Sequence, residues 1–178
     1  MTLSIRKLKS DDAAMVRWLL VRLFEGLSNR TYPAEFIDAQ RALYTEAVIR
    51  RKLGRPDSVS YGAFAVRTFA GFIIAFEMAP GLFYAEWGGV TPSLRRTGVM
   101  RALMRRMEAA VRAVRGRKVY LYTSLKNIPA AQTYLDCGYV VEGVLRNHFF
   151  GADFLLFGKS LRRVRFSAAY SRRPDFRP

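Results

Sequence analysis

The 178-residue sequence contains one cysteine, Cys137, and one histidine, His148. A single cysteine excludes an internal disulfide framework and an all-cysteine metal site, and one histidine cannot supply a His-x-x-x-His zinc site. Acidic residues are also scarce, because 14 Asp and Glu stand against 30 Lys and Arg, giving a formal net charge of +16. We therefore expect no metal, a reducing compartment such as the cytoplasm, and a surface that attracts phosphates or other anions.

Long hydrophobic runs are missing as well. The longest apolar stretch, 69–90, is interrupted by Glu77, by Pro80-Gly81 and by Glu86. Two buried strands joined by a turn explain this stretch better than a transmembrane helix does. The first residues lack the apolar run of a signal peptide. We expect a protein that does not contact membranes.

Three common catalytic motifs are absent. The chain has no Gly-x-x-x-x-Gly-Lys-Ser/Thr loop, no Gly-x-Gly-x-x-Gly after a strand, and no Gly-x-Ser-x-Gly elbow. Nucleotide hydrolysis, dinucleotide binding and serine hydrolysis therefore have no supporting signal.

Hydrophobic periodicity divides the chain into strands and helices in mixed order. Strands are predicted at 2–8, 60–67, 71–78, 82–90, 118–123, 139–145 and 154–161. Helices are predicted from Asp11 or Asp12 to Leu27, from Pro33 to Leu53, from about Met100 to Arg115, and over 129–136. This pattern indicates one α/β domain at 1–161, with a mixed, mainly antiparallel central sheet of about seven strands and about four helices. Residues 162–178, with six arginines and one aspartate, form a basic C-terminal tail.

The segment from Glu86 to Arg101 places a strand end, a basic loop and a helix start in direct succession. A helix start leaves backbone N–H groups unpaired and favours an anion, and Gly98 would allow close approach of the backbone. Arg95, Arg96 and Arg101 add full positive charges, which suits a pyrophosphate. A glycine that merely permits a turn beside surface arginines is the alternative explanation of this loop.

Two motifs resemble those of one known family. Arg95-Arg-Thr-Gly98-Val-Met100, preceded by Val90-Thr-Pro92, is similar to the Gln/Arg-x-x-Gly-x-Gly/Ala loop of the GNAT superfamily of acyl-CoA N-acyltransferases. Downstream, the segment from Asn127 to Tyr139 resembles the Asn, Ala-x-x-x-Tyr and Gly-Phe elements of that family, in the same order. The resemblance covers residues 2–161 and implies the GNAT fold. Met100 is a departure, because the family has Gly or Ala at this position.

The resemblance implies acetyl-CoA as co-substrate and assigns roles to individual residues. The pantetheine arm would pair with the strand end at Gly88, Gly89 and Val90, and Asn127 would hold the same region. The pyrophosphate would lie on the backbone of the loop and helix start, formed by Arg95, Arg96, Thr97, Gly98, Val99, Met100 and Arg101. Tyr134 would protonate the leaving thiolate. Its helical spacing alone favours a core aromatic residue, and the family motif is what favours the catalytic role.

The acceptor amine must lose a proton, and Glu86 is our candidate for the general base. Strand alternation predicts that Glu86 shares a face with Tyr84 and Gly88, toward the cofactor cleft. A surface carboxylate is the alternative reading of Glu86. Glu77 is the reserve candidate.

The sequence leaves two functions open. The first is an N-acetyltransferase that acts on a primary amine, either a small amine or a protein N-terminus. In support of a protein N-terminus, the segment of this chain from Leu145 to Phe157 is faintly similar to the closing hairpin of ribosomal-protein N-terminal acetyltransferases. The second is an RNA- or ribosome-binding module with a catalytically degenerate GNAT fold, in which the tail contacts phosphates and Phe166 and Tyr170 stack on bases. The oligomeric state, a homodimer included, is open.

Overall fold

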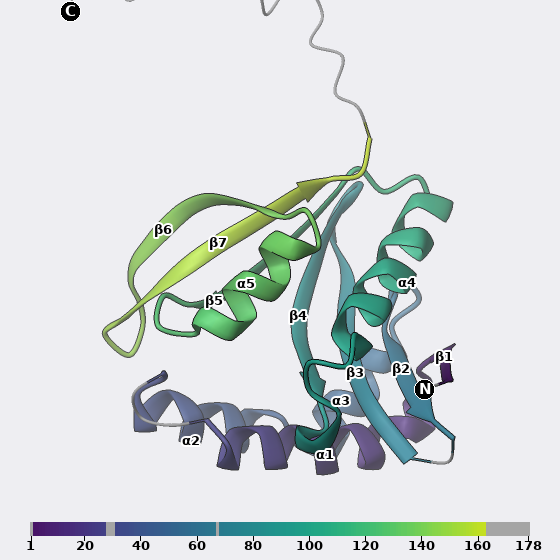
Figure 1. The fold of residues 1–178 in the computed structure, drawn as a ribbon, viewed down its shortest axis with the longest axis horizontal. Helices are drawn as coiled ribbons and strands as arrows, with labels where there is room; N and C mark the ends of the chain where they lie inside the picture. The colour runs from purple at the N-terminus through teal and green to yellow at the C-terminus, as the bar shows by residue number, and fades with distance from the viewer. Residues whose placement is uncertain (1, 28–30, 67, 163–178) are drawn as a thin grey trace, which may run out of the picture.

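The computed structural model describes residues 2–27, 31–66 and 68–162. One seven-stranded sheet has the order β1-β2-β3-β4-β5-β7-β6 (Figure 1). The strands are β1 Leu3–Lys7, β2 Tyr61–Ala65, β3 Thr68–Ala79, β4 Leu82–Val90, β5 Lys118–Ser124, β6 Val140–Phe149 and β7 Ala152–Ser160. Every neighbouring pair is antiparallel except β4–β5, which is parallel. The mixed, mainly antiparallel sheet predicted from the sequence is confirmed.

In the part of the chain that the structure describes, five α-helices cover the two faces of this sheet. They are α1 Ala13–Glu25, α2 Ala34–Leu43, α3 Glu46–Leu53, α4 Val99–Ala113 and α5 Ile128–Asp136. In Figure 1, α4 and α5 lie in front of the sheet, whereas α1 and α2 run along its lower end. Short 3-10 turns at Ser10–Asp12 and Pro92–Leu94 precede α1 and α4.

The helix predicted from Pro33 to Leu53 is two helices, so the expected number of about four becomes five. The chain leaves helical geometry at Tyr44, whose ψ is 61°. Thr45 then begins α3, because its side-chain oxygen accepts a hydrogen bond from the backbone N–H of Val48 at 3.3 Å. An N-cap threonine satisfies one of the unpaired donors of a helix start, and this capping signal lay within the apolar pattern that we read as continuous.

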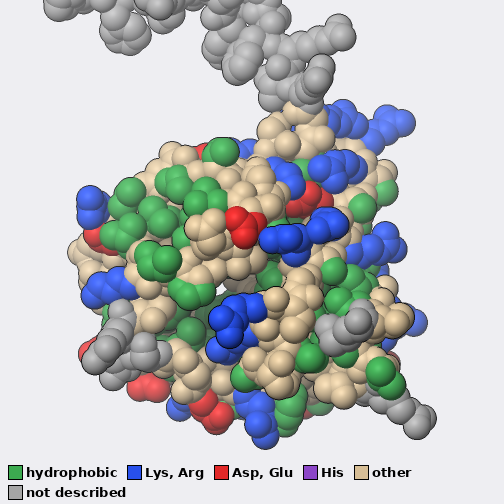
Figure 2. All heavy atoms as spheres, in the orientation of Figure 1, with side chains coloured by type: hydrophobic (Ala, Val, Ile, Leu, Met, Phe, Trp, Pro, Cys, Tyr) green, Lys and Arg blue, Asp and Glu red, His purple; other side chains and the backbone are tan. Residues whose placement is uncertain are grey.

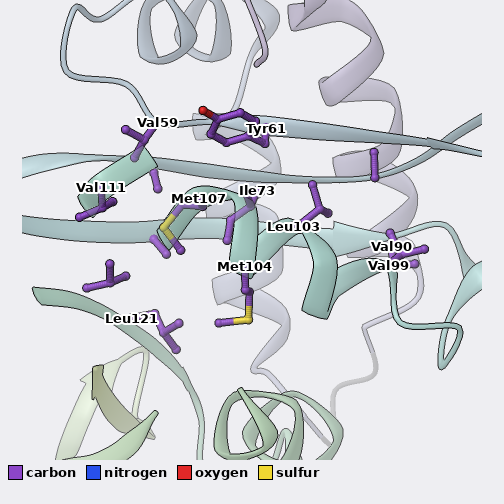
Figure 3. Packing of buried hydrophobic residues seen from close by; sticks show 14 of the residues in the cluster. Val59, Tyr61, Ile73, Val90, Val99, Leu103, Met104, Met107, Val111 and Leu121 are labelled. Carbon is purple, nitrogen blue, oxygen red and sulfur yellow. The ribbon is translucent and has the colours of Figure 1, made fainter. Parts of the chain in front are cut away.

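The core consists of two clusters, one on each face of the sheet. Figure 3 shows the cluster under α4, in which Leu103, Met104 and Met107 pack against strand residues such as Ile73 and Leu121. The second cluster joins α1, α2 and α3 to the opposite face. Alternate residues of β3 supply both clusters, as expected for a strand that is buried on both sides.

The parallel pair β4–β5 is short. Only Leu82, Phe83 and Tyr84 are in register with β5, opposite Lys118, Val119 and Tyr120. Beyond this point β4 continues along β3 and β5 continues along β7. The strands therefore separate in the middle of the sheet, and their facing edges carry no mutual hydrogen bonds.

A buried ion pair holds the C-terminal end of α5 near α4. Lys159 Nζ lies 2.9 and 2.7 Å from the two carboxylate oxygens of Glu108, which is 3% exposed, and donates to the carbonyl of Cys137 at 2.6 Å. Without Lys159, the buried Glu108 charge would keep only the longer contact with Arg112, at 3.6 Å, and such loss of a close partner in a buried pair is costly. We expect Lys159→Met to lower the free energy of unfolding by about 3 kcal/mol, measured by urea denaturation.

The matched control is Lys118→Met, because the Lys118–Glu142 pair lies at the surface, with side chains 38% and 31% exposed. The free energy of unfolding of this variant should fall by no more than about 1 kcal/mol. Equal losses in the two variants would contradict the role given to the Glu108–Lys159 pair.

Within the described residues, no helix is both long and apolar enough to cross a membrane. The basic tail predicted at 162–178 lies, apart from Arg162, outside the described residues.

Candidate functional site

A cavity of about 320 Å³ lies where β4 and β5 separate. Its walls come from both core clusters: Ile73, Leu121 and Tyr134 belong to the α4 side, and Phe36 and Trp87 belong to the α1–α3 side. Figure 2 shows a hollow on the face viewed, with Lys or Arg side chains at its edge. The cavity therefore passes through the plane of the sheet and joins the two faces.

Glu86 lies at a β-bulge. Ile74 is opposite Trp87 and Ala75 is opposite Ala85, so Glu86 is an extra residue in β4. Such a bulge interrupts the alternation of side chains. The prediction that Glu86 and Gly88 share a face was therefore wrong: Glu86 pairs with Lys52 of α3, whereas Gly88 faces Met100 of α4. Both residues nevertheless line the cavity.

The Glu86 carboxylate is held by a cation on one side. Lys52 Nζ donates to Glu86 Oε1 at 2.8 Å, and the two side chains are 22% and 13% exposed. Within the described part of the chain, no donor meets Glu86 Oε2 in hydrogen-bonding geometry. The Tyr44 phenol is a neighbour, and burial, followed by the Glu86 charge, raises its pKa. Oε2 is therefore a buried carboxylate oxygen that has no hydrogen-bond partner among the described residues.

Tyr134 lies on α5 and lines the cavity on the side opposite helices α1–α3. Its ring packs edge-on against Phe157 with ring centroids 5.4 Å apart. Burial, with smaller contributions from Tyr32 and Cys137, raises the pKa of the Tyr134 phenol above its usual value of 10.0. Among the described residues its hydroxyl makes no hydrogen bond. It is a neutral phenol with a proton available to a ligand.

Asn127 lines the same cavity at the start of α5. Its amide nitrogen donates to the Tyr32 hydroxyl at 3.1 Å, and that hydroxyl is also 3.1 Å from Thr123 Oγ1. The amide is thereby oriented, and its oxygen is left for another partner. Tyr32 was not found from the sequence, because it follows a break in the helical pattern and no local motif marks it.

The loop before α4 exposes backbone donors. Gly98 adopts φ 88°, the left-handed conformation that glycine tolerates best, and Arg96 has φ 62°. The first hydrogen bond of the helix runs from Ala102 N–H to Gly98 C=O. Within the described residues, the N–H groups of Gly98, Val99, Met100 and Arg101 have no backbone acceptor. Four free donors, the helix dipole and exposed arginines are features that favour a bound anion.

The other residues predicted at this site have distinct positions. Arg95, Arg96 and Thr97 are exposed in the loop, and the Val99 side chain is buried in the core, so only its backbone can meet a ligand. Val90 is buried at the end of β4. Arg101 is on α4, 3.5 Å from Asp136, beside a second groove of about 610 Å³ that also includes Arg105 and Lys159.

Met100 turns toward β4 rather than toward solvent. A Cβ built on Gly88 would lie 3.1 Å from Met100 Cε, so the missing side chain of Gly88 makes room for the methionine. Gly89 faces the opposite side, where a Cβ would lie 1.8 Å from Leu23 Cδ1. Met100 therefore narrows the cavity beside the strand edge of β4.

Replacing Met100 with alanine should widen the cavity beside Gly88, at the edge of β4. If the arm of a coenzyme A ligand passes Gly88, Met100→Ala should bind coenzyme A several-fold more tightly, because the thioether no longer has to move aside. Isothermal titration calorimetry measures this effect. Met100→Leu keeps the bulk and should bind like the parent protein, and equal affinities of all three proteins would show that Met100 does not limit entry.

The α1–α3 side of the cavity is aromatic. We call this wall the aromatic half; its members are Phe36, Tyr84, Trp87, Tyr122, Phe149 and Phe154. No local sequence pattern brings these six residues together, because they come from α2, β4, β5, β6 and β7. Only the folded sheet brings them together.

Glu77, the reserve base, does not belong to the site. Its carboxylate accepts the Gly81 N–H at the β3–β4 turn and does not line the cavity. The described residues also contain no group of three or more His, Cys, Asp or Glu side chains that could hold a metal ion.

Comparisons with known proteins identify a family and a shared fold. Residues 15–139 match the acetyltransferase (GNAT) family. The fold is similar to PaiA N-acetyltransferase from Thermoplasma acidophilum in complex with coenzyme A, with a TM-score of 0.77, 20% identity and coverage of 90% of this chain and 99% of that chain.

Two further solved structures share the fold. One is the ribosomal-protein-S18-alanine N-acetyltransferase from Escherichia coli, with a TM-score of 0.71, 14% identity and coverage of 93% of this chain and 99% of that one. The other is Ard1 from Thermoplasma volcanium, with a TM-score of 0.70, 20% identity and coverage of 92% and 100%. No curated protein matches the chain. At these identities the solved structures show the fold alone.

Proposed function

The chain belongs to the acetyltransferase (GNAT) family, and from that premise we propose that it transfers an acetyl group from acetyl-CoA directly to the primary amine of an acceptor, a small amine or a protein N-terminus. The observation that carries this proposal is the cavity at the β4–β5 separation, because it is lined by both Glu86 and Tyr134. A candidate base and a candidate acid therefore border one cavity.

The residues present fit acetyl-CoA. The free N–H groups from Gly98 to Arg101 suit its pyrophosphate, and the unpaired edge of β4 suits the amides of its pantetheine arm. The groove beside Arg101 and Arg105 supplies cations for a further phosphate. Asn127, fixed by Tyr32, would accept or donate one hydrogen bond to the arm.

The proposed chemistry assigns one proton to each group. The Glu86 carboxylate accepts the proton that the acceptor ammonium must lose, directly or through water, so that the amine lone pair can attack the thioester carbonyl. A C–N bond forms and the C–S bond breaks. The Tyr134 hydroxyl donates its proton to the departing thiolate. Because burial keeps this phenol protonated, it is available as an acid at neutral pH.

Coenzyme A titration tests the co-substrate site. We expect a saturable heat signal at low salt, and we expect deletion after Leu161 to change the dissociation constant by less than about twofold, because the anion site lies far upstream of the tail. No saturable signal from the full chain would overturn the assignment.

The deletion also addresses the nucleic-acid alternative, which rests on the charge of +16 and on a tail outside the described residues. If RNA binding is a function, the affinity for a single-stranded RNA should fall steeply with salt and with loss of the tail. The two functions are compatible, because they use different parts of the chain.

A further inference from the structure

The chemistry of the aromatic half restricts the acceptor, and this inference rests on the function proposed above. The cavity has a side for the co-substrate, near the free N–H groups of α4, and the opposite side faces α1–α3. With the thioester arm on the first side, the acceptor must reach Glu86 from the second. The aromatic half is therefore the wall that the acceptor touches.

The rings of the aromatic half hold one another in place. Phe36 lies 5.6 Å from Phe149 and 5.7 Å from Phe154 between ring centroids, and Tyr84 lies 5.2 Å from Tyr122. Trp87 makes edge contacts with Phe24 at 5.1 Å and with Tyr44 at 5.7 Å. Such a wall is already ordered before a ligand arrives, so a flat apolar group can pack on it at low entropic cost.

The charge and size of the cavity disfavour polyamines and peptides as acceptors. Glu86 is the one charged residue among the described residues that line the cavity, and Lys52 already offsets its charge. A polyamine would bring a second ammonium for which the cavity has no carboxylate, into a protein of net charge +16. A peptide would bring a run of backbone and side chains behind its amine, which is more bulk than a cavity of about 320 Å³ that also admits the thioester arm can hold.

We propose that the acceptor is a small primary amine attached to an aromatic or similarly flat apolar body. Its amine lies at Glu86 and its ring lies against the aromatic half. The cavity of about 320 Å³ is at the lower end of the range for ligand pockets, roughly 300–1,000 Å³, and it must also admit the thioester arm, so the acceptor has to be small.

Trp87 provides a binding signal that does not depend on turnover. The sequence has two tryptophans, and Trp18 is 50% exposed on α1, away from the cavity, so Trp18→Phe leaves Trp87 as the fluorophore. This variant, saturated with coenzyme A, is titrated with 2-phenylethylamine and with ethylamine, which share the amine and differ in the ring. We expect a saturable change with 2-phenylethylamine at concentrations at least roughly tenfold lower, because the ring is buried. Equal responses, or none, would overturn the proposal.

Two neighbouring phenylalanines give a matched pair of variants. Phe149 lines the cavity, whereas Phe150, 55% exposed at the hairpin turn, does not. We expect Phe149→Leu to lower kcat/KM for 2-phenylethylamine by roughly fivefold to tenfold and to leave coenzyme A affinity unchanged, and Phe150→Leu to change neither. Equal effects of the two substitutions would contradict the placement of the ring.

An acceptor panel separates failure of this inference from failure of the proposed function. Acetyl-CoA is supplied with 2-phenylethylamine, ethylamine, spermidine and a peptide with a free N-terminus. Preference for 2-phenylethylamine supports the inference. Preference for spermidine or the peptide overturns the inference and leaves the transferase function in place. Failure of every acceptor, together with absent coenzyme A binding, overturns the proposed function itself.

Discussion

Replacing Glu86 with glutamine is expected to lower kcat/KM for 2-phenylethylamine by roughly a hundredfold, the usual contribution of a general base. Glutamine has nearly the same shape and can still accept from Lys52 Nζ, which lies 2.8 Å from Oε1 in the parent protein. It cannot take a proton from the acceptor at neutral pH. The loss should therefore appear in transfer and be absent from the affinity for coenzyme A.

A low-basicity acceptor identifies the cause of that loss. An arylamine is uncharged at neutral pH, so it needs no base before it attacks. We expect Glu86→Gln to lower transfer to an arylamine far less than transfer to 2-phenylethylamine. Glu77→Gln, the same change outside the cavity, should leave both rates unchanged. Equal losses with the two acceptors would show that Glu86 positions the substrate or the fold and is not a base.

The second large effect is expected from Tyr134→Phe, which should lower transfer at least about tenfold and retain coenzyme A binding. Only the hydroxyl is removed, and in the described residues it makes no hydrogen bond that would stabilise the fold. Tyr139→Phe is the matched control, because its ring lies 6.4 Å from that of Tyr134 and does not line the cavity. An unchanged transfer rate in Tyr134→Phe would remove this residue from the mechanism.

The raised pKa of Tyr134 predicts how the rate of transfer depends on pH. Burial raises the pKa, so the phenol stays protonated up to at least about pH 10, the ordinary value for tyrosine. Transfer in the parent protein should therefore show no alkaline decline from this group below about pH 10. It should instead rise with pH as the acceptor ammonium loses its proton.

The strands, the amphipathic helix α4 and the turn before it could be predicted, because each depends on a pattern within a short stretch of sequence. The strands around Ile73 and Trp87 and the amphipathic helix α4 follow from periodicities of two and 3.6 residues. The turn into α4 follows from Gly98, because few other residues tolerate its φ of 88°. Each of these signals is contained within about ten residues of sequence.

The face of Glu86 could not be predicted in the same way. A bulge is a mismatch between two strands, and the sequence of β4 alone does not show which residue lacks a partner in β3. Lys52 and Tyr32 were missed for a related reason. Each reaches the site from an element that is distant in sequence, and nothing in its own surroundings distinguishes it from a surface lysine or a core tyrosine.

The short β4–β5 pairing has a mechanical consequence. In the described chain, β5, β6, β7 and α5 form one block, and the remaining elements form another. Within the sheet, only the three residue pairs between β4 and β5 join the two blocks. A molecule lodged in the separation, bonded to the edge of one strand and to the start of α5, would brace the two blocks as an additional strand does. The co-substrate is then also a structural component, one that adds strand-like bonding to the side-chain packing that already joins the two blocks on both faces of the sheet.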